Sequence, residues 1–247
     1  MRILVCAACV GALLVGLTLG RPPNEPARSG LRRPVALALA DAGRWLFVGN
    51  RNGCVAVIDT AAGRVVADIP VGRTVADLVA MPDGMHLLAV DEEAGELVVL
   101  RRDGAGLKVS RRLAVGPGPV GVAVAGSRAS VVALWPRRLI VIDLSASAEP
   151  RVGASVSLPF APRLQVPIGD DRVVVLALAG VGEVAVGGRR DGGWDRLGVG
   201  RGPTAVAVGP DGRHAFVANT FSDSVSVLDL TARRVAAEVP LGEKTEA

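Results

Sequence analysis

The chain has 247 residues, 50% of them hydrophobic, which is enough to bury a large core as a single domain. The formal net charge is +4, and almost all of the positive charge is arginine, because lysine occurs only at Lys108 and Lys244. The arginines are spread along the chain with acidic residues between them, so they do not form the clustered patch of a nucleic-acid-binding surface. We therefore expect no nucleic-acid partner.

Residues 1–20 have the pattern of a secretory signal. Arg2 precedes an uncharged apolar run over residues 3–19, and Gly20 completes a small-residue exit. This predicts a signal peptide over 1–20, a linker over 21–30, and an exported protein that is periplasmic or extracellular. The apolar run is also nearly long enough to span a bilayer. An uncleaved N-terminal anchor is therefore the alternative, and only in that case is a membrane a partner.

After residue 30 the sequence repeats with a period of about 42 residues. The motif [Val/Leu]-x-Val-[Ile/Leu]-Asp ends at Asp59, Asp143 and Asp229, so its copies are 84 and 86 residues apart, or two periods. Prolines open the repeats at Pro34, Pro119, Pro162 and Pro203. Repeats of this length indicate a stacked or radial architecture. The markers predict five units over residues 31–242, followed by a polar tail over 243–247.

The expected elements of each unit are four short strands, taken here in chain order. Repeat one contains the hairpin "LFVGNRNGCVAVIDT", repeat two "LLAVD", repeat three "VVALW" and repeat four "VVVLALA". Repeat five is the clearest, with "TAVAVGP", an Asp211-Gly212 turn, "HAFVAN", "SVSVLDL" and "RRVAAEVPLG". No segment carries a sustained helical period. Four strands in about 42 residues are typical of a β-propeller blade, so we predict an all-β, five-bladed propeller.

Two of these segments also resemble a known family. "CVAVIDTAAGRVVADIPVG" and "SVSVLDLTARRVAAEVPLG" are similar to the YVTN-type β-propeller repeat. Residues 47–50 and 216–219 stand where that family has Tyr-Val-Thr-Asn, whereas repeats three and four have lost the Asp-Gly turn and the Asn. The resemblance covers nearly all of the chain after residue 30 and implies a propeller. Similar repeats occur beside c-type cytochrome or peroxidase-like domains in exported bacterial proteins.

The number of blades raises the question of closure. Propellers that resemble this one usually have seven blades, and neither end of the repeat region offers a spare strand to join the first and last blades. Five blades form either a small closed ring or an incomplete one. An incomplete ring would expose two large apolar sheet faces. We therefore expect a protein partner or self-association.

No motif predicts a catalytic residue, a metal or a cofactor. His86 and His214 are 128 residues apart, three repeats, and each follows an Asp-Gly turn, so they mark one repeat position and not two halves of a site. Residues 116–121 spell GxGxxG, but two prolines remove amides and a strand is expected where a phosphate-binding helix would begin. The acidic loop over 91–96 allows calcium coordination, although its spacing matches no EF-hand and a solvated turn is favoured.

One set of loop residues is a candidate binding site. In a propeller, the loops from second to third strand and the connections between blades share one face. The predicted binding residues on these segments are Asn50, Arg73, Arg163, Arg201 and Asn219. Several arginines on such a face would favour an anionic group.

The preferred function is an exported, non-enzymatic propeller that serves as a binding or assembly platform. A first alternative is the propeller portion of a larger redox protein, with a cytochrome-type domain elsewhere or on a partner. A second alternative is a lactonase-like hydrolase, which the lack of clustered histidines or carboxylates on the predicted loops disfavours. Fold alone does not choose among them.

Overall fold

The computed structural model describes residues 32–104, 106–145, 149–169, 172–177, 181–188 and 193–242. The predicted signal peptide, the linker and the tail over 243–247 lie outside the described residues. Within the described part the chain forms strands and one short 3₁₀ turn, η2 (Asp41–Gly43), and no α-helix. None of this part is a helix with the length and hydropathy that a membrane span requires.

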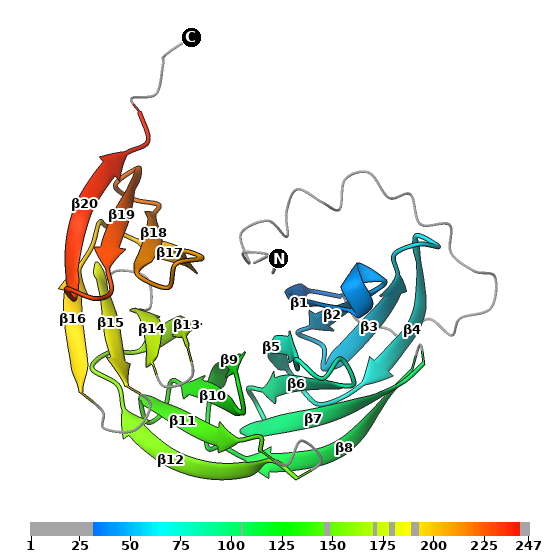
Figure 1. Cartoon of the computed structure of the whole chain (residues 1–247). Helices are drawn as coiled ribbons and strands as arrows, with labels where there is room; N and C mark the ends of the chain where they lie inside the picture. Colours follow the sequence, from blue (N-terminus) through cyan, green and yellow to red (C-terminus); the bar gives the residue numbers. More distant parts are fainter. Residues whose placement is uncertain are drawn as a thin grey trace. The chain divides into compact units, whose positions relative to one another are not determined.

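Five four-stranded antiparallel sheets follow one another along the chain (Figure 1). The first is β1 (Pro34–Ala40), β2 (Trp45–Asn50), β3 (Cys54–Asp59) and β4 (Arg64–Pro70). The second is β5 (Val75–Ala80), β6 (His86–Asp91), β7 (Glu96–Asp103) and β8 (Gly106–Ala114). The third is β9 (Pro119–Ala125), β10 (Arg128–Ala133), β11 (Arg138–Asp143) and β12 (Arg151–Ser157). The fourth is β13 (Pro162–Ile168), β14 (Arg172–Ala177), β15 (Glu183–Gly188) and β16 (Trp194–Gly198). The fifth is β17 (Pro203–Val208), β18 (His214–Asn219), β19 (Ser224–Asp229) and β20 (Arg234–Pro240).

In every sheet the strands pair in sequence order, so each repeat is a simple meander. This confirms the prediction of five four-stranded blades. The chain divides into two compact units, and the boundary falls inside β9. The N-terminal unit consists mainly of the first two sheets, and the C-terminal unit consists mainly of the last three.

The core of the N-terminal unit lies between its two sheets. Because side chains alternate across a strand, every second residue of the first sheet points at the second sheet. These residues are apolar and pack against an equally apolar face of the second sheet. The two sets are Ala36, Ala38, Phe47, Val55 and Val57 on the first sheet, and Leu78, Leu87, Ala89, Val98 and Leu100 on the second.

The core of the C-terminal unit follows the same rule. Valines from the fourth sheet meet valine, alanine and leucine side chains from the fifth. The buried members are Val174, Val184, Val186, Val206, Ala215, Val217, Leu228 and Leu230. β-Branched and small side chains fit closely spaced pleated sheets, which explains how a chain with 3% aromatic residues builds its core.

Candidate functional site

The loop between the second and third strands of a sheet contacts a connection to a neighbouring sheet. We call the edge of the sheet where these two segments meet the linker edge. In the N-terminal unit, the amides of Val71 and Gly72 both donate to Gly53 O, at 2.9 and 3.0 Å. In the C-terminal unit, Thr220 N donates to Gly202 O at 2.9 Å and Phe221 N donates to Arg201 O at 3.0 Å. Within each unit, these loops therefore share one edge of the sheets, as the sequence predicts.

Glycine is required where the two segments touch in the N-terminal unit. Gly53 has a φ of +79°, and a Cβ added there would lie 2.1 Å from Gly72 O. Any side chain would push the two backbone segments apart and break the bonds that join them.

Two of the predicted binding residues have internal partners. Asn50 is 2% exposed, and its Nδ2 donates to Val48 O at 3.1 Å. Asn219 is also 2% exposed, and its Nδ2 donates to Ser226 Oγ at 2.9 Å. Both amides therefore hold the start of the loop through internal hydrogen bonds. Because they are buried, they are not available to a ligand at the surface.

In the second sheet Asp91 takes the place of these asparagines. Its carboxylate is buried and accepts hydrogen bonds from the backbone amides of Arg73 at 2.7 Å, Thr74 at 3.1 Å and Ala94 at 3.1 Å. Three donors satisfy a buried carboxylate without a metal ion. Asp91 therefore binds the connection from the first sheet to the second.

The other carboxylates of the acidic loop are paired with arginines. Glu92 lies 2.8 Å from Arg51, Glu93 lies 3.8 Å from Arg73, and Glu96 lies 2.9 Å from Arg112. These ion pairs offset the loop's negative charge and give the predicted binding residue Arg73 an acidic neighbour. The described residues contain no group of three or more histidines, cysteines or carboxylates that could hold a metal ion.

The linker edge of the C-terminal unit has a different composition. The side chain of Arg201 is exposed and has no ion-pair partner among the described residues, while its backbone N donates to Ser222 Oγ at 3.0 Å. Beside it, Phe221 is 63% exposed. The ring packs directly on Gly202, where a Cβ would lie 2.4 Å from Phe221 Cδ2 and where φ is +64°. The hydroxyls of Thr204 and Thr220 lie 2.8 Å apart on the same two segments.

Arg163, the remaining predicted residue, lies near the start of β13, and its side chain is exposed. Its side chain makes no hydrogen bond or ion pair that joins it to Arg201 or Asn219 in the described part of the chain. The structure thus brings Arg201 and Asn219 to one edge in the C-terminal unit, and Asn50 and Arg73 to one edge in the N-terminal unit.

Sequence reasoning missed Phe221. The residue lies in a polar turn, where a single apolar side chain does not by itself indicate a binding site. One signal was available, because the chain has only four phenylalanines and this one follows a strand in a loop of hydroxyl and acidic residues. A guanidinium beside an exposed ring and two hydroxyls suits an anion that carries an apolar or planar part.

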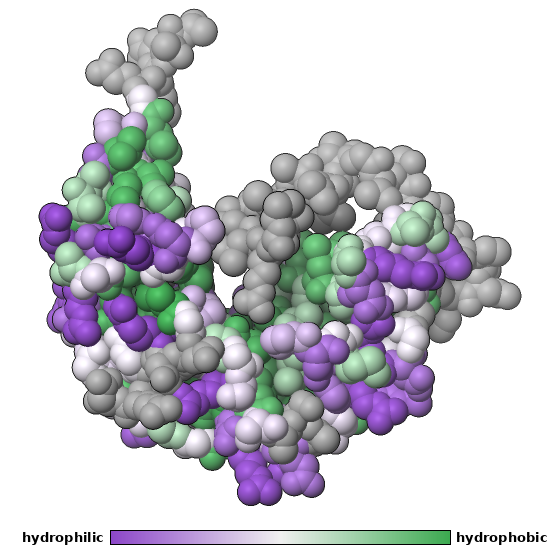
Figure 2. All heavy atoms as spheres, in the orientation of Figure 1, coloured by the Kyte–Doolittle hydropathy of each residue, from purple (hydrophilic) through white to green (hydrophobic). Residues whose placement is uncertain are grey.

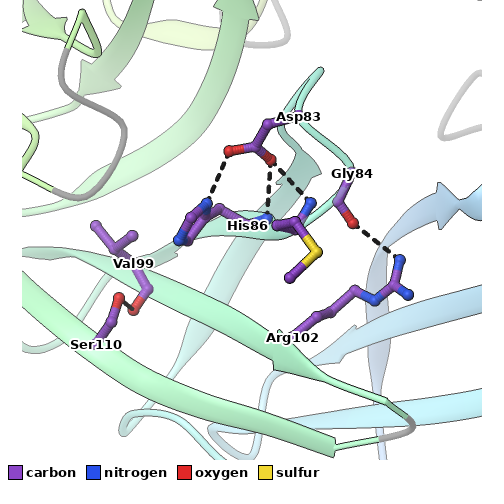
Figure 3. A network of polar contacts seen from close by, with 7 residues as sticks. Asp83, Gly84, His86, Val99, Arg102 and Ser110 are labelled. Carbon is purple, nitrogen blue, oxygen red and sulfur yellow. Dashed lines mark hydrogen bonds and ion pairs between the residues drawn. The ribbon is translucent and has the colours of Figure 1, made fainter.

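The two histidines belong to turns outside the linker edges. His86 Nδ1 lies 2.7 Å from Asp83 Oδ2, and Arg102 donates to Gly84 O at 2.9 Å in the same turn (Figure 3). His214 Nδ1 lies 2.8 Å from Asp211 Oδ2 in the equivalent turn of the fifth sheet. The hydrogen bond from His214 lowers the pKa of Asp211 to about 2. Both histidines thus close the turn that precedes a second strand.

The GxGxxG match at residues 116–121 leads into β9. A strand has no helix N-terminus for a phosphate, so this segment lacks the structure that the motif needs.

Comparisons with known proteins identify the fold. No family model and no curated protein matches the sequence. A functionally unknown protein from Desulfotomaculum acetoxidans is similar in structure, with a TM-score of 0.70, 15% identity, and coverage of 90% of this chain and 76% of that one. The dihydro-heme d1 dehydrogenase NirN has a TM-score of 0.66 and 18% identity, with 84% of this chain and 48% of that chain covered. The periplasmic gluconolactonase PpgL of Pseudomonas aeruginosa has a TM-score of 0.62 and 23% identity, with 85% and 70% covered.

The five consecutive four-stranded meanders and these structural similarities define the class: the chain is a β-propeller protein. It spans about half the length of NirN. At these sequence identities the similarity establishes the fold but not the activity, which depends on the residues of the site.

Proposed function

We propose that this chain is an exported, non-enzymatic propeller of the YVTN-repeat type that serves as a binding platform for an anionic group. The observation that carries the proposal is the exposed pair of Arg201 and Phe221 at the linker edge of the C-terminal unit. The polar side chains that recur from sheet to sheet are engaged in turns. Arg201, by contrast, places a charge at the surface without a described ion-pair partner.

The ligand class follows from the side chains. A guanidinium binds carboxylate or phosphate oxygens through two parallel hydrogen bonds, and an exposed ring adds apolar contact. Arg163 supplies a second exposed cation in the same unit. We therefore favour an anionic group on a partner protein or small molecule that also presents an apolar or aromatic part.

The binding proposal is tested by NMR titration of the full chain with benzoate and with inorganic phosphate. We expect the amides of residues 201–204 and 220–222 to shift, and Arg201→Gln to weaken binding about tenfold, as loss of a charged hydrogen-bond donor does. Arg213→Gln is the matched control, because Arg213 is exposed in the same sheet at its opposite edge. Shifts that are absent, or that Arg213→Gln reduces equally, would contradict the proposal.

Export is supported by the signal-like pattern of residues 1–20 and by the periplasmic location stated for PpgL. We expect protein isolated from its native host to begin near residue 21. Mass spectrometry of the N-terminal peptide decides this, and an intact Met1 on cytosolic protein would contradict it.

The redox alternative gains support from NirN, of which this chain covers 48%. If the chain is the propeller part of a larger redox protein, the protein purified from its native host without overexpression will show the absorbance of haem.

The lactonase alternative gains support from PpgL. Incubation with a gluconolactone and titration of the released acid tests it. We expect hydrolysis at the rate of the buffer alone. A faster rate that is lost when the protein is denatured would instead support the lactonase alternative over the platform proposal.

A further inference from the structure

The fifth sheet has one apolar face that is largely exposed. Phe216 is 43% exposed and Val239 is 47% exposed on this face, which also contains partly buried residues from the other strands. The register aligns Ala207, Phe216, Val227 and Ala237 across the sheet in one row. The second row is Ala205, Ala218, Val225 and Val239. We call these eight residues the terminal face, and Figure 2 shows hydrophobic side chains at the surface formed by β17–β20.

The first sheet of the same chain shows how this face is covered elsewhere. Its corresponding rows contain Ala38, Phe47, Val57 and Ala67, and Ala36, Gly49, Val55 and Ile69. There Phe47 is 1% exposed, because the second sheet packs on it. The residue after the last strand follows the same pattern, since Val71 is 1% exposed and Leu241 is 68% exposed. The two faces have nearly the same residues, but most of those on the first sheet are buried, whereas those on the fifth are partly buried or exposed.

The side chains that cover Phe47 identify the complementary surface. They come from the second sheet and include Leu78, Leu87, Ala89, Val98 and Leu100. The repeat places Leu37, Leu46, Val48, Ala56 and Ile58 of the first sheet at the same positions. Of these only Ala56 is buried, and the neighbouring Leu39 is 42% exposed. We call this opposite side of the first sheet the initial face.

We propose that the terminal face is an interface for a second copy of this chain, and that its occupant is the initial face of that copy. Each chain carries both halves of a contact that the repeat already builds between its first and second sheets. Contact between two different patches of identical chains is head-to-tail. Large contiguous apolar patches are rarely left uncovered on a monomeric soluble protein. This self-association is independent of anion binding at Arg201.

The other arrangement of two copies is terminal face to terminal face. It would place two faces of the same composition against each other, and the packing of the first sheet on the second shows no such pair of like faces. The head-to-tail arrangement instead places the terminal face, with its alanines, valines and Phe216, against the larger Leu37, Leu46 and Ile58 of the initial face, as the second sheet packs on Phe47 within the chain. Alternation of large and small side chains across a contact gives the interdigitation of a native core.

Two variants test the proposal, each damaging one half of the contact. Phe216→Arg alters the terminal face, and Leu39→Glu alters the initial face. Both positions are exposed, so the fold should survive, and circular dichroism with urea unfolding checks this. Sedimentation velocity over a dilution series should show that each variant associates about 30-fold or more weakly than the wild type, the effect of losing an interface hot spot. Met85→Arg is the matched control, because it adds the same charge at an exposed apolar residue of the second sheet, outside both faces.

Mixing the two variants gives the decisive result. A Phe216→Arg chain keeps its initial face and a Leu39→Glu chain keeps its terminal face, so an equimolar mixture should form a heterodimer through the two intact surfaces. Association that survives Phe216→Arg, for example through the apolar run at residues 3–19, would overturn the proposal. So would a Leu39→Glu chain that still dimerises, or a wild type that stays monomeric at all concentrations.

Discussion

At the scale of single residues, Asp77 gives the folded chain a dependence on pH. It lies half-buried on β5, and its Oδ2 accepts a hydrogen bond from Val122 N at 2.9 Å. Burial raises the pKa of Asp77 to about 6, although the amides of Val122 and Leu78 favour the ionised form. Because the folded state holds this proton more tightly than the unfolded chain, stability falls as pH rises from about 4 to about 6.

We expect Asp77→Asn to remove that decline, because the neutral amide still offers an oxygen to Val122 N. Urea unfolding at several pH values between 4 and 7 measures it. The wild type should lose about 2 kcal/mol more than the variant across this range, somewhat less than the full shift since the side chain is half-buried. If the free energy of unfolding changes equally with pH in the two proteins, the folded state does not raise the pKa of Asp77 and the prediction is wrong.

Asn219 acts through its buried amide. Its Nδ2 also lies 3.2 Å from Ser224 Oγ, and Ser226 Oγ accepts from Gly200 N at 3.2 Å. We expect Asn219→Ala to cost about 1–3 kcal/mol of unfolding free energy, because it removes the partner of buried hydroxyls. Thr220→Ala is the control, since Thr220 is exposed and should cost less than about 0.5 kcal/mol. Equal losses of unfolding free energy in the two variants would contradict a structural role for this amide.

At the scale of elements, the junction between a loop and the next connection depends on close backbone contact. Gly53→Ala would place a methyl group against Gly72 O, and the positive φ adds strain. We expect a loss of about 2 kcal/mol or more in unfolding free energy. Gly198→Ala provides the comparison, because a Cβ there meets nothing within 4 Å. Chemical denaturation of both variants measures the difference, and a Gly53→Ala chain as stable as wild type would contradict this junction.

The sheets could be predicted from the sequence because strand alternation is a local signal that recurs in every repeat, and the Asp-Gly turn marks the clearest of them. The loop edges followed from the same repeat. The roles of Asn50, Asn219 and Asp91 could not be predicted, because whether a loop amide faces a ligand or the neighbouring backbone depends on contacts across the sheet. Phe221 was missed for a related reason, since its packing on Gly202 joins two distant segments.

At the scale of the whole molecule, a repeat protein presents a similar apolar face at each sheet, and each such face needs a neighbouring sheet or another partner to cover it. The sequence raised this difficulty as a question of closure and predicted a partner or self-association. It could not say which residues remain exposed, because Phe47 and Phe216 occupy the same place in their repeats and differ only in what packs on them.

The central claim, that the repeat packs its internal faces and leaves a terminal one for a second copy, is tested by fluorine NMR of fluorophenylalanine-labelled protein. The four phenylalanines report four environments, at Phe47, Phe160, Phe216 and Phe221. A soluble paramagnetic agent should leave Phe47 and Phe160 protected and Phe221 accessible at every protein concentration. Phe216 should be protected in concentrated protein and become accessible on dilution. A Phe216 signal whose accessibility does not change with concentration would contradict the account.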